Sequence, residues 1–293
     1  MSTTSTIGAN NRLHQVKLKG QGLQAHLVGA CTSAKLSAST SQITELDFTF
    51  ADDDDLAIFR RGTFAIGTIL TYDKWVGRVT AVELKPENAG PSVKVRAPSR
   101  YVQRLQNQTG EQNWGSYPVT RWVQQCAQSA GMKHIVEPDI GNRQIVREKA
   151  EGDNPDSTWD VMTQLARETG RLLFEYGDTL IFARPTWLAS RAGRRQIRLN
   201  WKNWNEYSEG MDGMPGFKDA AQRKDQELTV GLTSADADTF RPGDELILEG
   251  NMGRANGSWM VTKVDFSLSI TKPVKLTCKR FVNPTPEPTK DDK

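Results

Sequence analysis

The clearest structural signals lie in Ser157-Thr-Trp-Asp-Val-Met-Thr-Gln-Leu-Ala-Arg-Glu-Thr-Gly170 and in Gly177-Asp-Thr-Leu-Ile-Phe182. The first stretch predicts a helix, because Ser157 and Asp160 fit a capping box with aspartate in place of glutamate. Gly170 is suited to end that helix. The second stretch places Gly177-Asp178 between two β runs, which indicates a tight hairpin. The two stretches together predict a helix followed by a hairpin.

Apolar residues at helical spacing occur twice in this part of the chain. In the helix above they are Trp159, Met162, Leu165 and Ala166, and we expect them to pack against the hairpin 172–182. An earlier set runs between Pro118 and Gly131 and comprises Val119, Trp122, Val123, Cys126, Ala127 and Ala130. Pro185 is expected to end the unit. We therefore predict that residues 98–186 form an α+β insert of two helices and a hairpin.

The segments on either side of this insert have the alternation of β-strands. Apolar residues alternate with polar ones at Leu23, Ala25 and Leu27, at Leu46, Phe48 and Phe50, and at Leu228, Val230 and Leu232. Short strands separated by turn residues are typical of a small barrel or sandwich. We predict a first β domain over 1–97 and a linker with a second β domain over 187–282. The tail 283–293, with three prolines, is expected to be disordered.

The two β segments share a pattern that suggests an internal duplication. Phe59-Arg-Arg-Gly62 precedes the strand Trp75-Val-Gly-Arg-Val-Thr-Ala-Val82, and Phe240-Arg-Pro-Gly243 precedes Trp259-Met-Val-Thr-Lys-Val264. The glycine stands where a tight entry to a strand needs one. We expect two related β units, with Trp75 and Trp259 in equivalent places.

The composition excludes several classes of protein. The 293 residues include 38 basic and 35 acidic ones, a net charge of +3, which does not favour a dedicated duplex-DNA binder. No stretch approaches the 18 or more apolar residues of a membrane span, so no stable membrane insertion is expected. Met1–Arg12 is polar, so no secretory signal is expected. Cys31, Cys126 and Cys278 fit neither a disulfide framework nor a Cys-x-x-Cys unit.

Motifs of catalysis and of metal or nucleotide binding are weak. Gly20-Gln-Gly22 matches a dinucleotide fingerprint in letters, but an alternating strand is expected after it, so we interpret it as a β turn. Asp52–Asp55 offers oxygen ligands for a cation, or a loop that caps the short segment 56–59. His14, His26 and His134 share no metal-ligand spacing. No catalytic residue, metal or cofactor is predicted.

One basic and aromatic stretch is a candidate interaction site. It comprises Arg191, Arg194, Arg195, Arg198, Trp201, Trp204 and Tyr207. Such a stretch resembles a platform for single-stranded nucleic acid, but we favour the interpretation as an interface or a salt-bridged surface. It has no clear period of its own, so we predict that it lies at contacts between protomers or with a neighbouring protein.

The order of these elements resembles the bacteriophage tail or baseplate hub family, also called late control protein D-like, which is related to the spike base of type VI secretion. The resemblance covers about 40–285 and is clearest over 155–186 and 239–281, which hold the motifs Ser157–Gly170, Gly177–Phe182, Phe240–Leu248, Gly257–Val264 and Leu276–Arg280. It implies a mainly β fold in which two tube-type barrels flank the α+β insert. It also implies a structural virion protein without enzymatic activity, assembled in the bacterial host cytoplasm.

The resemblance further implies a homotrimeric hub at the distal end of the tail. Six barrels in a ring would match the sixfold tail tube and carry a threefold tail tip or spike. Its implied partners are the tail tube or distal tail protein, the tip or spike protein and the tape measure protein. DNA would pass through the channel without specific binding. Two other classes stay open, a tail-associated cell-wall hydrolase and a carbohydrate-binding β-sandwich.

Overall fold

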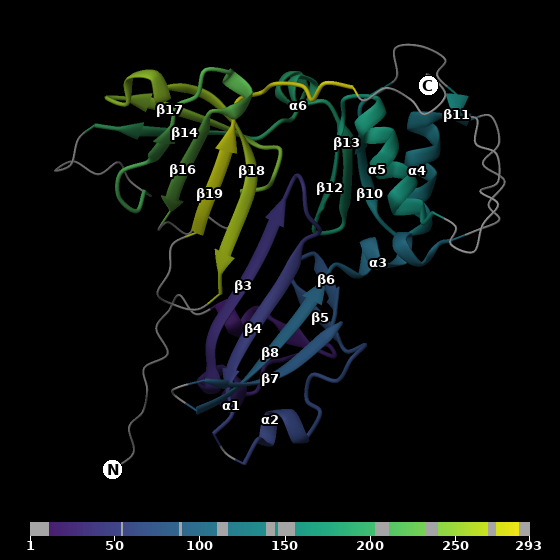
Figure 1. The fold of residues 1–293 in the computed structure, drawn as a ribbon, viewed down its shortest axis with the longest axis vertical. Coiled ribbons are helices and arrows are strands. Elements are labelled where there is room, and N and C mark those ends of the chain that lie inside the picture. Colours follow the sequence, from purple (N-terminus) through teal and green to yellow (C-terminus); the bar gives the residue numbers. More distant parts are fainter. Residues whose placement is uncertain are drawn as a thin grey trace.

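The chain is mainly β, and its two longest helices lie side by side in the insert (Figure 1). The computed structural model describes residues 12–53, 55–87, 90–109, 117–138, 144–145, 156–202, 211–232, 240–268 and 274–286. Among these residues no helix is long and apolar enough to cross a membrane.

A ten-stranded sheet runs through most of the molecule. Along its path lie β15 (Gly216–Lys218), β16 (Glu227–Leu232), β19 (Val274–Lys279), β18 (Gly257–Ser267), β3 (Cys31–Ser39), β4 (Glu45–Ala51), β8 (Gly90–Pro98) and β7 (Ala81–Glu87). The remaining two strands are β17 (Glu245–Gly250), which pairs with β18, and β14 (Gln196–Trp201), which pairs in parallel with β17. The predicted β character of both flanks is confirmed, but the sheets are not closed into two separate barrels, because β18 joins the two halves.

A smaller sheet covers the N-terminal half. Its four strands are β2 (Gln21–Gly22), β1 (Lys17–Leu18), β5 (Ile69–Tyr72) and β6 (Trp75–Arg78). The helices beside it are η1 (Arg12–Gln15), α1 (Ala25–Ala30) and α2 (Ala57–Arg60). The strand predicted around Leu23–Leu27 is wrong, since α1 begins at Ala25. Leu23 and Leu27 are both buried, but Leu23 precedes the helix and Ala25 is exposed, so the buried positions do not alternate as in a strand.

The insert has more elements than the sequence predicted. Its helices are α3 (Arg100–Asn107), α4 (Val119–Ser129) and α5 (Thr158–Glu168), and its sheet has the order β10 (Lys133–Val136), β13 (Thr179–Ala183), β12 (Leu172–Tyr176). Short strands β9 (Tyr117–Pro118) and β11 (Gln144–Ile145) form a separate pair. The hairpin of β12 and β13 is confirmed, and β10 adds to it in parallel.

The predicted helix boundaries in the insert are confirmed by their caps. Ser157 and Asp160 form the capping box of α5. Gly131 and Gly170 take positive φ angles of +80° and +61° just past α4 and α5, which favours glycine there. Met162 and Leu165 are buried in one cluster with Leu180 and Phe182 of the hairpin, and Trp159 packs at its margin.

The ends of the insert depart from the prediction. Pro185 begins a helix, α6 (Pro185–Ser190), rather than ending the unit, because proline suits the first helical turn. Short helices η2 (Arg223–Asp225) and η4 (Gly253–Ala255) lie further along the chain. The predicted disordered tail begins in contact with the insert, since Asn283 Oδ1 accepts hydrogen bonds from Thr186 N and Oγ1. The rest of that tail, 287–293, lies outside the described residues.

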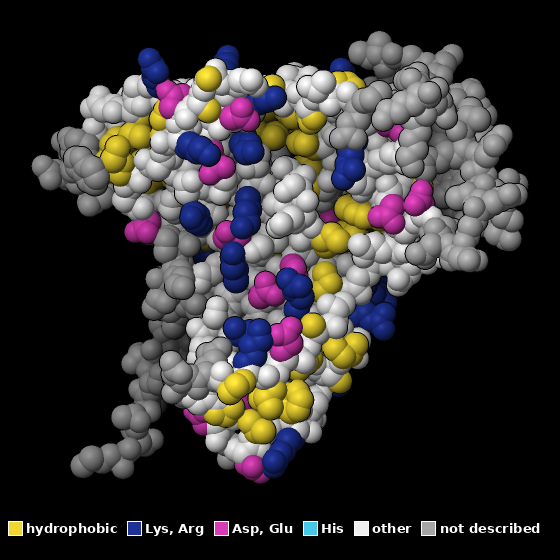
Figure 2. All heavy atoms as spheres, viewed as in Figure 1, with side chains coloured by type: hydrophobic (Ala, Val, Ile, Leu, Met, Phe, Trp, Pro, Cys, Tyr) yellow, Lys and Arg dark blue, Asp and Glu magenta, His cyan; other side chains and the backbone are white. Residues whose placement is uncertain are grey.

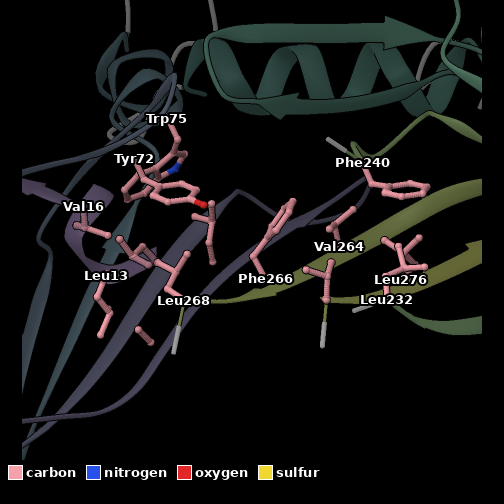
Figure 3. Close-up of a cluster of buried hydrophobic side chains, with 14 of the residues drawn as sticks. Leu13, Val16, Tyr72, Trp75, Leu232, Phe240, Val264, Phe266, Leu268 and Leu276 are labelled. Carbon is pink, nitrogen blue, oxygen red and sulfur yellow. The ribbon is translucent and has the colours of Figure 1, made fainter. Parts of the chain in front are cut away.

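The largest apolar core extends across both β halves. It is one cluster that includes Leu13 and Trp75 near the N-terminus and Val264, Phe266 and Leu276 near the C-terminus. Figure 3 shows Phe266 and Val264 between the side chains of the two halves. We call β3 to β8 the first β unit and β14 to β19 the second β unit. The common core holds them together where β18 meets β3.

Candidate functional site

The two β units repeat the same strand register. In the first unit β4 pairs with β8, so that Leu46 lies opposite Ala97 and Phe48 opposite Val95. In the second unit β16 pairs with β19, so that Leu228 lies opposite Cys278 and Val230 opposite Leu276. The strands that precede β4 and β16 also pair in the same register. Leu36 of β3 lies opposite Leu46, and Phe217 of β15 lies opposite Leu228. Strands β3, β4 and β8 of the first unit therefore correspond to β15, β16 and β19 of the second.

The hairpin that follows is also repeated, down to its irregularities. Gly67 N donates to Val79 O while Val79 N donates to Thr68 O, and Gly243 N donates to Val261 O while Val261 N donates to Asp244 O. Both glycines have positive φ, +89° and +88°, as in a bulge that begins with a left-handed glycine. This match makes β6 and β7 of the first unit correspond to β18 of the second.

The threonine after each valine confirms that alignment. Thr80 Oγ1 donates to Arg96 O over 3.5 Å, and Thr262 Oγ1 donates to Thr277 O over 2.9 Å. The repeated segments are therefore Val79-Thr-Ala-Val82 and Val261-Thr-Lys-Val264.

The expected equivalence of Trp75 and Trp259 is wrong by two residues. Trp259 lies opposite Leu246, and the corresponding pair in the first unit is Gly77 opposite Leu70. Likewise Gly67, and not Gly62, corresponds to Gly243. The sequence motif Phe-Arg-x-Gly misled because the bulge glycine of the first unit stands five residues later than the motif places it.

The repeated units join edge to edge. Strand β18 pairs antiparallel with β3, with Asp265 opposite Ser37 and Phe266 opposite Leu36. Phe266 and Leu36 are buried on the core face, while Asp265 accepts a 2.9 Å hydrogen bond from Ser37 Oγ on the opposite face. Lys35 and Lys263 also contact Asp265, both at 3.1 Å. The joint is thus a strand pairing with an apolar side and a charged side.

The charged side continues across the whole sheet. Figure 2 shows Lys and Arg side chains interspersed with Asp and Glu in a band over the central strands. The strand pairings place these charged residues on one face: Glu45, Asp47, Glu83, Glu227 and Asp265, and Lys35, Lys85, Lys94, Arg96, Lys263, Lys275 and Lys279. Arg96 contacts Glu45 and lies 3.8 Å from Asp47, and Lys85 lies 2.9 Å from Glu83. The face is therefore polar but locally neutralised.

The carboxylates on this face have shifted pKa values. Partial burial, reinforced by the neighbouring Asp47, raises the pKa of Glu45. Burial likewise raises the pKa of Asp47, although Arg96 and Lys35 oppose it. Burial opposes ionisation of Asp265 too, but the hydrogen bond from Ser37 and the two lysines lower its pKa. The charged form of Asp265 at the joint is thus favoured, whereas the charged forms of Glu45 and Asp47 are disfavoured.

The candidate arginines lie along β14 and the turn before it. Arg194 Nε donates to Glu245 Oε2 over 3.0 Å, and Arg198 Nη1 donates to Glu249 Oε1 over 2.6 Å. The Arg195 guanidinium lies 5.9 Å from the centre of the Phe240 ring. The two ion pairs join β14 and the turn before it to β17, so the charges of Arg194 and Arg198 are neutralised within the chain.

The aromatic members of that candidate site do not form a platform in the part of the chain that the structure describes. Trp201 is 3% exposed and belongs to the common core, because its position on β14 faces inward. Its apolar surface is therefore not surplus in the protomer, which was the reason for predicting it at an interface. Trp204 and Tyr207 lie outside the described residues.

A cavity of about 250 Å³ lies between the hairpin of the insert and the second β unit. Phe174 and Tyr176 line it from β12, and Arg191, Arg241 and Asp244 line it from the other side. The Arg241 guanidinium lies 5.3 Å from the centre of the Tyr176 ring. Burial raises the pKa of Asp244 to about 6, against the hydrogen bond from Arg241 N and the nearby arginines.

The remaining motifs have structural explanations. Asp52 Oδ1 and Oδ2 accept hydrogen bonds from Ile58 N and Phe59 N, so this carboxylate caps α2 as the loop interpretation predicted. Asp54 lies outside the described residues. Gly20 has φ +84° in the turn between β1 and β2, as a β turn requires. Within the described ranges, no three His, Cys, Asp or Glu residues gather as metal ligands.

Cys126 and Cys278 pack in the apolar cores. Cys126 and Cys278 are buried, and burial raises the pKa of the Cys126 thiol to about 12. Burial also raises the pKa of Cys278. A thiol that resists ionisation is a poor nucleophile.

Solved structures of bacteriophage tail proteins share this fold. A tail protein from Neisseria meningitidis MC58 superposes with a TM-score of 0.61 and 11% identity, covering 94% of this chain and 98% of that one. The 43 kDa tail protein of prophage MuSo2 from Shewanella oneidensis gives 0.60 and 12% identity, covering 92% and 98%. No protein-family model matches the sequence, and no curated protein matches it either.

The fold therefore belongs to the class of bacteriophage tail proteins, and the resemblance expected from the sequence is confirmed at that level. A further similar structure is the E. coli protein c3393, with a TM-score of 0.56 and 15% identity, covering 90% of this chain and 76% of that one. That protein is described as a component of the type VI secretion system with structural similarity to the T4 bacteriophage tail proteins gp27 and gp5. The chain thus has the tail-protein fold that also occurs in type VI secretion.

Proposed function

We propose that this protein is the trimeric hub at the distal end of a phage tail, where it joins the sixfold tail tube to a threefold tail tip or spike. The observation that carries the proposal is the internal repeat. Two β units with the same strand register stand side by side in one chain, joined through β18 and β3. Three such chains present six equivalent units, which is what a threefold protein needs to dock on a sixfold tube.

The polar face of the ten-stranded sheet is suited to line the DNA exit channel. A channel should not hold its cargo, since each cation that contacts a phosphate adds affinity. On this face Arg96, Lys35 and Lys85 are each close to a carboxylate. The paired charges favour passage of DNA without specific binding.

The insert and the segment 191–198 are proposed to contact the neighbouring tail proteins. The partners are the tail tube or distal tail protein on one side and the tip or spike protein on the other, with the tape measure protein passing between them. Arg191, Arg194, Arg195 and Arg198 remain interface candidates in this proposal, while Trp201 serves the core. The role is structural, so purified peptidoglycan incubated with the protein should release no fragments.

The mass of the purified protein in solution tests the hub. One chain has a mass of 32.7 kDa, so light scattering should give three times that value. A protein that remains a monomer or forms a dimer at its highest soluble concentration contradicts the proposal. Adding the matching tail tube protein should then produce a complex with three hub chains and six tube chains.

A further inference from the structure

We propose that each copy of this chain pairs with the next through two sheet edges, with β7 of one copy running antiparallel to β15 of its neighbour. In the proposed register, Leu84 lies opposite Phe217 and Glu83 opposite Lys218. The inference rests on the trimeric hub proposed above and specifies how its protomers are held together.

The register follows from the joint inside one chain. There Asp265 and Phe266 of β18 lie opposite Ser37 and Leu36 of β3. The shared bulge and the paired threonines make Glu83 and Leu84 of β7 the counterparts of Asp265 and Phe266. The pairing of β15 with β16 makes Lys218 and Phe217 the counterparts of Ser37 and Leu36. Repeating the internal joint between chains therefore yields one register.

Both edges are available in the part of the chain that the structure describes. Strand β7 pairs only with β8 there, and β15 pairs only with β16, so these strands end the sheet on its two sides. An exposed edge strand presents unpaired backbone groups that another chain can pair with. Because one chain carries one edge of each kind, the contact is head to tail, and such contacts generate rings when the rotation closes.

The side chains at the free edges are suited to be buried by a strand of a neighbouring chain. Leu84 is 38% exposed, whereas its counterpart Phe266 at the internal joint is 2% exposed. Hydrophobic side chains gather on the surface near β7 and α2 (Figure 2). Pairing with β15 would set Phe217 beside Leu84 on the core face. The exposed leucine is therefore explained by a missing neighbour.

Charge at the two edges is complementary. At the internal joint the carboxylate of Asp265 meets Ser37 and Lys35. At the proposed contact Glu83 would face Lys218, and both side chains are exposed in the single chain. Opposite charges directly across an antiparallel pair stabilise it, whereas like charges would not. The proposed contact between chains would thus pair a carboxylate with a lysine, as the internal joint does.

Disulfide trapping tests the register directly. Leu268 N donates to Ala34 O and Thr40 N donates to Thr262 O at the internal joint, so alternation makes Asp265 and Ser37 a non-hydrogen-bonded pair. Side chains of such pairs lie close enough for a disulfide. The double variant Glu83→Cys/Lys218→Cys, made in a Cys31→Ser background because Cys31 is partly exposed, should oxidise to a covalent trimer on a non-reducing gel.

Three controls separate the outcomes. Asp265→Cys/Ser37→Cys, the internal counterpart, should lose two free thiols without a change in mass. Lys85→Cys/Lys218→Cys, on the same face but two residues out of register, should give little covalent product. Each single variant should give no covalent trimer.

The results distinguish the edge pairing from the hub itself. A trimer by light scattering that gives no Glu83→Cys/Lys218→Cys product overturns the proposed register and leaves the trimeric hub standing. A monomer without product overturns both. A covalent ladder that continues beyond three chains supports the edge pairing and contradicts the closed trimer.

Discussion

The indole of Trp75 lies over Gly77, so that a Cβ atom at position 77 would stand 2.1 Å from the Cη2 atom of the ring. The residue that corresponds to Gly77 in the second β unit is Trp259, whose own indole is buried and donates from Nε1 to Ala255 O. Each unit therefore carries a tryptophan in the second strand of its hairpin. In the aligned registers the two tryptophans stand two residues apart. The duplication conserves the strand register while the side chains have been rearranged.

Gly77→Ala should strongly destabilise the first unit. The added methyl group meets a buried ring, so the ring or the strand must move, and overpacking of this kind costs about 1–3 kcal/mol or more. Denaturant unfolding measures the loss. Gly29→Ala is the matched control, because nothing lies within 4 Å of a Cβ there, and it should not lower stability. If the repeat is real, Trp75→Gly/Gly77→Trp should recover part of the loss; a double variant less stable than Gly77→Ala argues against it.

Leu165→Ala should cost about 2–5 kcal/mol, because the leucine is buried between α5 and the hairpin and its removal leaves a cavity. Arg167→Ala, on the exposed side of the same helix, should stay within about 0.5 kcal/mol of the native protein. Equal effects of the two substitutions on the free energy of unfolding would mean that this side of α5 is not core.

The stability of the protein should fall as pH rises from about 4.5 to about 7. Glu175 is buried and accepts a 2.9 Å hydrogen bond from Thr44 N, and burial raises its pKa from 4.5 to about 7. Between those values the folded chain holds a proton that the unfolded chain has lost, so this contribution is complete below the lower pKa and disappears through the upper one.

Glu175→Gln should remove that contribution. The unfolding free energy of the native protein should decline by at most about 1.4 kcal/mol per pH unit through this window from the one group. Relative to the native protein the variant should be more stable at pH 8 than at pH 5. Asp244, with a pKa of about 6, leaves a residual slope of the same sign. Asp225→Asn, at an exposed site, serves as the control; a pH profile unchanged by Glu175→Gln would contradict the assignment.

Removing the carboxylates beside Arg96 should make the polar face bind DNA. The native protein should not bind single-stranded DNA with submicromolar affinity at about 150 mM salt, since Arg96, Lys35 and Lys85 are each close to a carboxylate. Glu45→Gln/Asp47→Asn frees Arg96, so affinity should rise at low salt and the logarithmic salt slope should steepen by roughly 0.7 per freed cation.

The control for that experiment removes the same charge elsewhere. Asp53→Asn/Asp225→Asn lies at exposed positions outside the ten-stranded sheet and should change DNA binding far less. Tight binding by the native chain, or an equal gain in both double variants, would exclude the polar face as a passive channel lining.

Local signals in the sequence predicted the insert well because they depend on few residues. The capping box of Ser157 and Asp160 and the turn at Gly177 act within four positions of the chain, so tertiary packing did not override them. The helix α1 and the strand β10 were missed, since six-residue and four-residue elements give too few apolar positions to fix a period.

The candidate site depended on long-range pairing that no local pattern contains. The assignment of Trp201 to an interface failed because β14 pairs with β17, more than forty residues later, and that pairing turns the indole inward. The duplication was recognised from Trp75 and Trp259, whereas the register resides in Val79-Thr80 and Val261-Thr262. The strand registers and the hydrogen bonds of the two bulges and the two threonines identify the equivalent positions.

The central claim is that three chains place six β units in one ring around a channel. Averaged electron micrographs of the purified oligomer, viewed along its symmetry axis, test it most directly. We expect a closed ring with threefold symmetry, six similar β lobes and an open centre. A dimer, an open filament or a trimer without a central opening would contradict it.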